Sequence, residues 1–427
     1  MSYTKKTLAS GLRVIIVPMP GSLTTTVRVL TQTGSKYESK QQNGVAHFLE
    51  HLCFKGTKKR PNAQAITEEL DMIGASSNAF TAHEYTGYYA KAEPHHFEKI
   101  LDIVADIFIN STFPKAEIEK ERGVIVGEIE MYEDQPQDEV ADLFTDLLYG
   151  DQPAGRKILG TRETIRTLSR TQIAAYHAKH YVASRTIVIV AGKVDEKAAL
   201  KAVERAFAGI PRGAGGAKKK VIERQHMPAI AVRHKKTSQT HLILGFRSIP
   251  ITDTRTHALA ILRGVLGGGM SSRLYRRIRE EMGAGYYVGA SNEFFTDHGF
   301  FAIHAGVDSV RVEEVIRAIM EEVRRLCDEP IGEAELTKAK NMYASGLVAG
   351  LETSGAQASY YGFDEVHNLP IIPPHDEARL LHAVTAQEVQ DIARAIFTDD
   401  RLNLALVGPH KNAKPFEKLL TVHPAKQ

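Results

Sequence analysis

The sequence predicts an α+β protein of two similar domains, each presenting a sheet packed against helices. With 427 residues, the chain is longer than one ordinary hydrophobic core requires. A Gly-Ala-Ser sequence at 74–76 recurs in the second half, at 289–291. Residues 211–220 are rich in glycine and lysine and show no periodicity, which is typical of a linker. We therefore expect domains at 1–210 and 221–427, joined by this linker.

Further matches between the two halves support the repeat. In each match, the two residues are separated along the chain by the same distance as the two Gly-Ala-Ser sequences, or by one residue more. So steady an offset between the two halves is hard to produce by chance. It indicates that each half contains the same series of elements. The additional pairs are Phe80 and Phe295, Thr81 and Thr296, His83 and His298, Arg185 and Arg401, and Gly192 and Gly408.

Hydrophobic periodicity predicts the elements of the first half. Alternating apolar residues predict strands, and apolar residues three and four positions apart predict helices. A continuous apolar run, as at 186–191, is typical of a buried strand. The expected strands are 12–18, 24–33, a pair within 75–92, and 186–191; the expected helices are 63–73, 95–109, 115–133, one ending near 180, and 196–208.

The composition is that of an ordinary globular protein, and it argues against several classes. Hydrophobic residues make up 43% and charged residues 25%, and the longest apolar runs have only strand length, so we expect no membrane partner. The first residues contain no apolar signal region and no long Arg-rich leader, which favours a cytoplasmic location. Basic residues exceed acidic ones by only 3, too few for a nucleic-acid surface. The 2 cysteines lie far apart in helical apolar patterns, which indicates buried packing.

A short histidine motif carries the chemistry of the first half. The sequence HFLEH begins at His47 in a helical pattern, with Asn43 as the expected N-cap and Gly56 as the expected stop. On a helix, His47 and His51 lie about 40° apart on one face, so two neutral imidazoles can chelate a tetrahedral zinc ion. Glu50 lies on the neighbouring part of the helix and can reach a water on the metal without ligating the metal.

The order His-x-x-Glu-His is the inversion of the commoner zincin pattern and is the signature of inverzincins. The alternative is a pair of ordinary surface or buried histidines on an amphipathic helix. At the repeat offset, the second half has the stretch 262–266, which contains no histidine and no carboxylate. Only the first domain is therefore expected to hold the metal.

Several longer stretches together resemble the pitrilysin/insulinase family of zinc peptidases, in particular its short-chain branch that includes mitochondrial processing peptidase. HFLEHLCFKGT at 47–57 resembles the metal-site helix of that family, and NAFT at 78–81 its substrate-side strand. EIEKERGVIVGEIEM at 117–131 resembles its third-ligand helix. In the second half, GGGMSSRLYRRIR at 267–279 and GYYV at 285–288 resemble its most recognisable segment. The resemblance covers nearly the whole chain.

The resemblance implies a fold and a ligand set. Two homologous domains, each with a mainly antiparallel sheet, are expected to form a clam-shell around a peptide chamber. One zinc ion per chain is expected, held by His47, His51 and Glu128, because the spacing from His51 to Glu128 along the chain is that of the family. Glu121 is expected to support the site from behind the ligands. The alternative for this glutamate-rich helix is a solvated acidic face.

The resemblance also implies a zinc-dependent endopeptidase that hydrolyses extended, unfolded peptides, with Glu50 as the general base. A peptide is expected to add to the edge of the strand at Asn78 and Ala79. In the second domain, Tyr286 is expected to donate to the developing oxyanion, while Arg279 anchors the peptide backbone. The alternative is that Arg279 makes a surface ion pair with Glu280 or Glu281 and that Tyr286 only packs.

A second function class stays open, that of a catalytically silent partner or scaffold subunit, which the family also contains. The intact ligands favour an active enzyme, because a silent subunit usually shows damage in its zinc motif. The resemblance further implies a homodimer, or a heterodimer with a related subunit.

Overall fold

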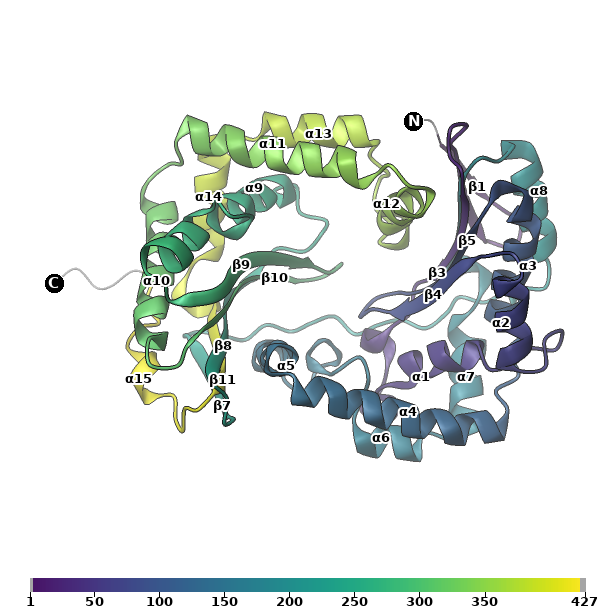
Figure 1. The fold of residues 1–427 in the computed structure, drawn as a ribbon, viewed down its shortest axis with the longest axis horizontal. Helices are drawn as coiled ribbons and strands as arrows, with labels where there is room; N and C mark the ends of the chain where they lie inside the picture. Colours follow the sequence, from purple (N-terminus) through teal and green to yellow (C-terminus); the bar gives the residue numbers. More distant parts are fainter. Residues whose placement is uncertain (1–2, 423–427) are drawn as a thin grey trace. The chain divides into compact units, whose positions relative to one another are not determined.

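The computed structural model describes residues 3–422, and the outer ends of the two expected domains, 1–2 and 423–427, lie outside the described residues. The chain forms two compact α+β units (Figure 1). Among the described residues, none of the helices combines the length and apolarity needed to span a bilayer. Unit 1 consists of Met1–Glu130, Arg156–Lys219 and Val348–Pro373, and unit 2 consists of Met131–Gly155, Lys220–Leu347 and Pro374–Gln427.

In the part of the chain that the structure describes, the sheet of unit 1 has six strands in the order β1-β2-β6-β3-β5-β4. Strands β2 and β6 run parallel, and the other neighbouring pairs run antiparallel. The sheet is therefore mainly antiparallel, as expected, and β4 lies at its edge. The strands are β1 (Thr4–Thr7), β2 (Arg13–Pro18), β3 (Thr25–Thr31), β4 (Ser76–Thr81), β5 (Thr86–Ala92) and β6 (Thr186–Gly192).

The described strands of unit 2 repeat this order, as β7-β11-β8-β10-β9, and none of them is a counterpart of β1. Strands β7 and β11 run parallel, in the places of β2 and β6, and the other neighbours run antiparallel. The sequence repeat is therefore also a structural repeat, and the expected fold of two similar α+β domains is confirmed. The strands are β7 (Ala229–His234), β8 (Gln239–Ser248), β9 (Gly285–Phe294), β10 (Gly299–Asp308) and β11 (Leu402–Gly408).

Helices cover both faces of each sheet (Figure 1). Unit 1 contains α1 (Val45–Cys53), α2 (Ala63–Asp71), α3 (Phe97–Ile109), most of α4 (Lys115–Asp134), α6 (Arg162–Thr167), α7 (Arg170–His180), α8 (Glu196–Ala206) and α12 (Ser354–Val366). Unit 2 contains α5 (Pro136–Tyr149), α9 (Thr256–Gly267), the π-helix η6 (Tyr275–Glu281), α10 (Val312–Asp328), most of α11 (Glu333–Gly350), α13 (Pro374–Ala383), α14 (Ala386–Ile396) and α15 (Lys414–Glu417). The expected elements of the first half are present, with ends that differ by a few residues.

The core explains why β6 is apolar throughout. Val188 and Val190 point into the cluster formed with α1, α3 and α8, whereas Ile187 and Ile189 point into a second cluster under α12. Because both faces of the strand are covered, neither can carry polar side chains.

Two helices pack in a unit that their sequence positions do not suggest. Helix α5, from the first half, packs on β8 and β11, where Phe144 joins an apolar cluster with Val407. Helix α12, from the second half, packs on β3 and β6, where Tyr361 joins a cluster with Ile189. The compact units are therefore not the two continuous segments 1–210 and 221–427. The boundaries at 210 and 221, and the linker at 211–220, stay predictions about where the two sequence repeats begin and end.

Candidate metal centre and active site

Helix α1 carries the histidine motif, and a carboxylate from earlier in the chain holds its N-terminus. The N-cap position is Gly44, whose φ of 94° suits a residue without a Cβ, so the expected cap at Asn43 is wrong. The backbone amides of Gly44 and Ala46 each donate to Glu38 at 2.8 Å. The Asn43 side chain donates to the same carboxylate at 2.9 Å. Glu38 thus satisfies amides that a capping side chain normally satisfies.

The three expected zinc ligands converge. The Nε2 atoms of His47 and His51 each lie 3.7 Å from Oε2 of Glu128 on α4. The three ligand atoms all lie within 4.8 Å of one another. A separation of 3.7 Å is too long for a hydrogen bond, whereas adjacent ligands of a tetrahedral zinc with bonds of about 2.0–2.1 Å lie roughly 3.3 Å apart. The donor set and its spacing therefore fit one zinc ion.

The protonation state of His47 also suits a metal ligand. Burial, together with the charge of His51, lowers the pKa of His47 to about 3, so its imidazole is neutral near pH 7. Its Nδ1 is buried and has no hydrogen-bond partner within residues 3–422. A metal on Nε2 would engage the other nitrogen of this ring.

Glu121 lies behind His51, on the side of its Nδ1. Its Oε2 is 3.1 Å from Nδ1 of His51, and its Oε1 pairs with the Lys55 ammonium at 2.9 Å. Burial by itself raises the pKa of Glu121, but the hydrogen bonds from His51 and Lys55 outweigh it and bring this pKa below its ordinary value. An ionised Glu121 accepts a hydrogen bond from the Nδ1–H of His51, which leaves Nε2 of His51 available as a ligand atom. The contribution of Lys55 was not expected from the sequence.

Glu50 lies beside the three ligands and is not one of them. Burial raises its pKa above the ordinary value, with Thr81 and His51 acting in the opposite direction. The Thr81 hydroxyl, at the end of β4, donates to Oε2 of Glu50 at 2.7 Å. We assigned no role to Thr81 from the sequence, although its place in the NAFT stretch was a signal. A carboxylate that a hydrogen bond holds in place and whose pKa is raised is suited to accept and return a proton.

Asn78 and Ala79 lie on the edge strand β4. Ala82, just after the strand, donates its amide to the Tyr85 carbonyl at 2.8 Å in the turn to β5. Because antiparallel pairs alternate, the backbone groups of Ala79 then point away from β5 and toward the free edge. Its amide is occupied by the Asn78 side chain, whose Oδ1 accepts at 2.9 Å. A peptide strand at this edge would compete with that contact.

Arg279 and Tyr286 lie in unit 2, in η6 and at the start of β9. The Arg279 guanidinium donates to the backbone carbonyls of Gly285 at 2.7 Å and Tyr286 at 2.9 Å. Glu281, considered as an ion-pair partner for Arg279, instead pairs with Arg277 at 3.3 Å. The Tyr286 side chain is 59% exposed, so it is not a packing residue of the core.

Known proteins resemble this chain over nearly its whole length. Residues 13–162 match the family model described as insulinase (peptidase family M16), and residues 167–343 match the model described as the peptidase M16 inactive domain. A Bacillus subtilis (strain 168) protein named as an uncharacterized zinc protease is 35% identical over 412 residues, which cover 95% of this chain and 98% of that protein. A Rickettsia felis protein of the same description is 34% identical over 404 residues, with coverage of 94% and 97%.

Solved structures agree on the fold. A protease from Helicobacter pylori is similar with a TM-score of 0.89 and 23% identity, covering 95% of this chain and 99% of that one. A Pseudomonas fluorescens structure described as a peptidase M16 inactive domain has a TM-score of 0.89 and 20% identity, with coverage of 96% and 99%. The two family models and the relatives identical at 34–35% over almost their whole length carry the assignment. The chain therefore belongs to the insulinase family of peptidases, peptidase family M16, as the motifs indicated.

Proposed function

We propose that this chain is an active zinc-dependent endopeptidase that cleaves extended, unfolded peptides. One observation carries the proposal: His47, His51 and Glu128 converge within 4.8 Å, with the carboxylate of Glu50 held beside them. When bound, zinc would supply a Lewis acid that lowers the pKa of a coordinated water toward ~7 and polarises the scissile carbonyl.

In this proposal, each residue of the site in unit 1 has its own role in peptide hydrolysis. Glu50 accepts the proton of the attacking water and returns it to the leaving amine, and the hydroxyl of Thr81 keeps its carboxylate in place. Glu121 holds the ring of His51 through Nδ1, which keeps the ligand nitrogen oriented. The substrate lies along the free edge of β4 at Asn78 and Ala79, where main-chain hydrogen bonds require little of its sequence.

The second unit contributes to the same reaction in this proposal. Tyr286, with an exposed phenol, donates to the developing oxyanion. Arg279 acts on the peptide backbone or, through its bonds to the carbonyls of Gly285 and Tyr286, sets the position from which Tyr286 acts. We also propose a cytoplasmic location and a homodimer, or a heterodimer with a related subunit; light scattering on the purified chain distinguishes a monomer from a dimer.

A catalytically silent partner subunit is the competing function. One observation favours it: the model that matches residues 167–343 is described as an inactive domain. The competing reading predicts a chain that binds peptides and leaves them intact under all metal conditions, whereas our proposal predicts cleavage by the chain alone.

The deciding experiment measures zinc content and peptide cleavage together. The purified chain should cleave an unstructured peptide, lose cleavage when a chelator removes zinc, and regain it on zinc addition. His51→Ala should lose both zinc and cleavage, because too few ligands remain, and Glu128→Gln should weaken zinc binding. Full zinc occupancy in His51→Ala would refute the metal site, and a zinc-loaded chain that cleaves no peptide would favour the silent subunit.

A further inference from the structure

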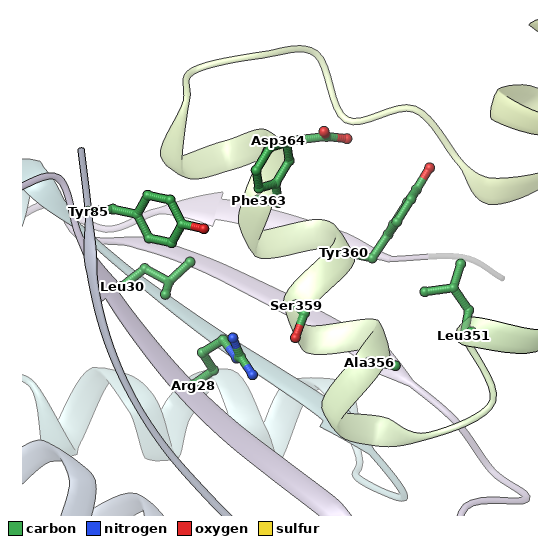
Figure 2. A pocket seen from close by; sticks show the side chains of 10 residues that line it. Arg28, Leu30, Tyr85, Leu351, Ala356, Ser359, Tyr360, Phe363 and Asp364 are labelled. Carbon is green, nitrogen blue, oxygen red and sulfur yellow. The ribbon is translucent and has the colours of Figure 1, made fainter. Parts of the chain in front are cut away.

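Unit 1 contains a pocket on the face of its sheet that α12 covers (Figure 2). Its volume is about 490 Å³, within the range of roughly 300–1,000 Å³ that small-molecule sites occupy. Strand β3 contributes Arg28 and Leu30, and Tyr85 comes from the turn before β5. The opposite wall consists of α12 and the turn before it, including Leu351 and Tyr360. The walls are thus largely apolar and aromatic, with one cation.

That cation, Arg28, has no carboxylate partner among the described residues. Its guanidinium lies 4.9 Å from the ring centroid of Tyr89 and 5.7 Å from that of Phe80, and its Nε is buried without a hydrogen-bond partner in residues 3–422. By contrast, Arg13 on the neighbouring part of the sheet pairs with a carboxylate at 3.0 Å, and so does Arg60 at 2.7 Å. A partly buried guanidinium stays charged at neutral pH and is costly to desolvate when unpaired.

The surroundings of Arg28 favour an anion. Burial lowers the pKa of Arg28, and the nearby Tyr89 and Tyr85 act in the opposite direction. A negative partner would offset the free energy that burial of the charged guanidinium costs. The N-terminal turn of α12, whose Ala356 lines the pocket, adds the positive end of a helix dipole. The one acid of the lining, Asp364, lies at the far end from Arg28 (Figure 2). Its carboxylate accepts from the Ile372 amide at 3.4 Å.

Strand register connects the pocket to the proposed peptide edge. Arg28 pairs with Tyr89 across β3 and β5, and Tyr89 pairs with Asn78 across β5 and β4. Directly paired residues share a face of the sheet, so these three side chains form one row that ends at the edge strand. Phe80 stands on the same face, and the next residue, Thr81, holds Glu50. A peptide strand on the edge of β4 would direct every second side chain to this face.

We propose that this pocket binds a carboxylate of the substrate peptide through Arg28, so that the enzyme selects peptides with a negative group in that register. The inference rests on the proposed function and adds a substrate class to it. A planar guanidinium accepts a carboxylate in two parallel hydrogen bonds, and the aromatic walls exclude water around the pair. The carboxylate belongs either to an acidic side chain or to the C-terminus of the peptide.

The test measures binding of labelled dodecapeptides by fluorescence anisotropy, using zinc-loaded Glu50→Gln protein so that the peptides stay intact. One series has amidated C-termini and a single Glu moved through every position, each with a Gln twin. A second pair is neutral in its side chains and differs only in a free or amidated C-terminus. The variants are Arg28→Gln, Arg28→Lys and the control Lys91→Gln, which removes a positive charge from the same face of β5.

We expect one Glu position, or the free C-terminus, to bind about ten- to a hundred-fold more tightly than its neutral twin. Arg28→Gln should abolish that difference while neutral peptides and zinc bind as before, and Arg28→Lys should keep part of it. Lys91→Gln should retain the difference. The proposal is overturned if no carboxylate is preferred, if the preference survives Arg28→Gln, or if Lys91→Gln removes it equally. If zinc-loaded protein binds no peptide at all, neutral or acidic, the proposed function itself fails.

Discussion

Replacing Glu121 by Gln tests whether the metal centre depends on residues behind its ligands. The side chain is only 6% exposed, its Oε2 lies 3.1 Å from Nδ1 of His51, and its Oε1 pairs with Lys55 at 2.9 Å. Glutamine keeps an oxygen acceptor but loses the charge. A hydrogen bond to a charged group is worth about 1.5–3 kcal/mol and a neutral one about 0.5–1.5 kcal/mol, so the loss is about 1–2 kcal/mol.

That loss corresponds to a zinc affinity about 5- to 30-fold weaker. This range overlaps the fall in metal affinity that usually follows when a hydrogen-bond partner of a metal-binding histidine is removed. The assay is competition for zinc against a chromophoric chelator, with the free energy of unfolding measured alongside to exclude a damaged fold. Glu117→Gln is the matched control, because Glu117 lies on the same helix and its ion pair within the described part of the chain is with the exposed Lys120, at 2.6 Å. If Glu121→Gln binds zinc as tightly as the wild type, or if Glu117→Gln weakens binding equally, the reasoning about His51 is wrong.

Four further outcomes are expected. Glu50→Gln should keep zinc and fold but lose most turnover, since an amide cannot accept the proton of water; near wild-type cleavage would exclude Glu50 as the base. Tyr286→Phe should reduce kcat by about ten- to a thousand-fold with zinc content unchanged, whereas an unaltered kcat/KM would remove its hydroxyl from the chemistry. Phe144→Ala should destabilise the protein by about 3–5 kcal/mol in urea unfolding, because this ring is 1% exposed in the cluster beneath α5; a change under about 1 kcal/mol would contradict that packing. Lys36 and Lys218 hold the pKa of Glu84 at about 2 despite its burial, so the stability that ionised Glu84 gives the fold is complete above pH ~4.5 and is lost as the pH falls toward ~2. Glu84→Gln should therefore make the free energy of unfolding in urea depend less on pH between pH 5 and pH 3. An unchanged pH dependence would refute this reasoning.

The sequence was a good guide to local structure. The spacing of His47 and His51 places two imidazoles on one helix face wherever that helix lies, because helix geometry is local. The apolar run of β6 indicated a buried strand, and the constant offset between matching residues of the two halves indicated a duplicated sheet, which the two strand orders confirm. The N-cap of α1 was the local exception, since Asn43 is a good capping residue that here donates to Glu38 instead.

The contacts of the site were predicted only where a resemblance supplied them. Glu128 lies far beyond His51 in the sequence, and no periodicity links two residues so widely separated. Lys55 and Thr81 looked like an ordinary helix-end cation and a strand residue. Their roles come from the side chains that α4 and α1 bring next to them.

By itself, the sequence determined the family through its motifs, and also the repeat, most elements of the first half and the residue types able to hold zinc, because these follow from motif and periodicity. Only the tertiary structure decided which sheet each helix covers. Helices α5 and α12 are amphipathic in the same way, and an apolar stripe fits either sheet, so the choice follows from the path of the chain and not from the helix sequence. The sequence equally could not show that Arg28 has no carboxylate partner among residues 3–422, because a missing partner is a property of the packed neighbours and not of the arginine.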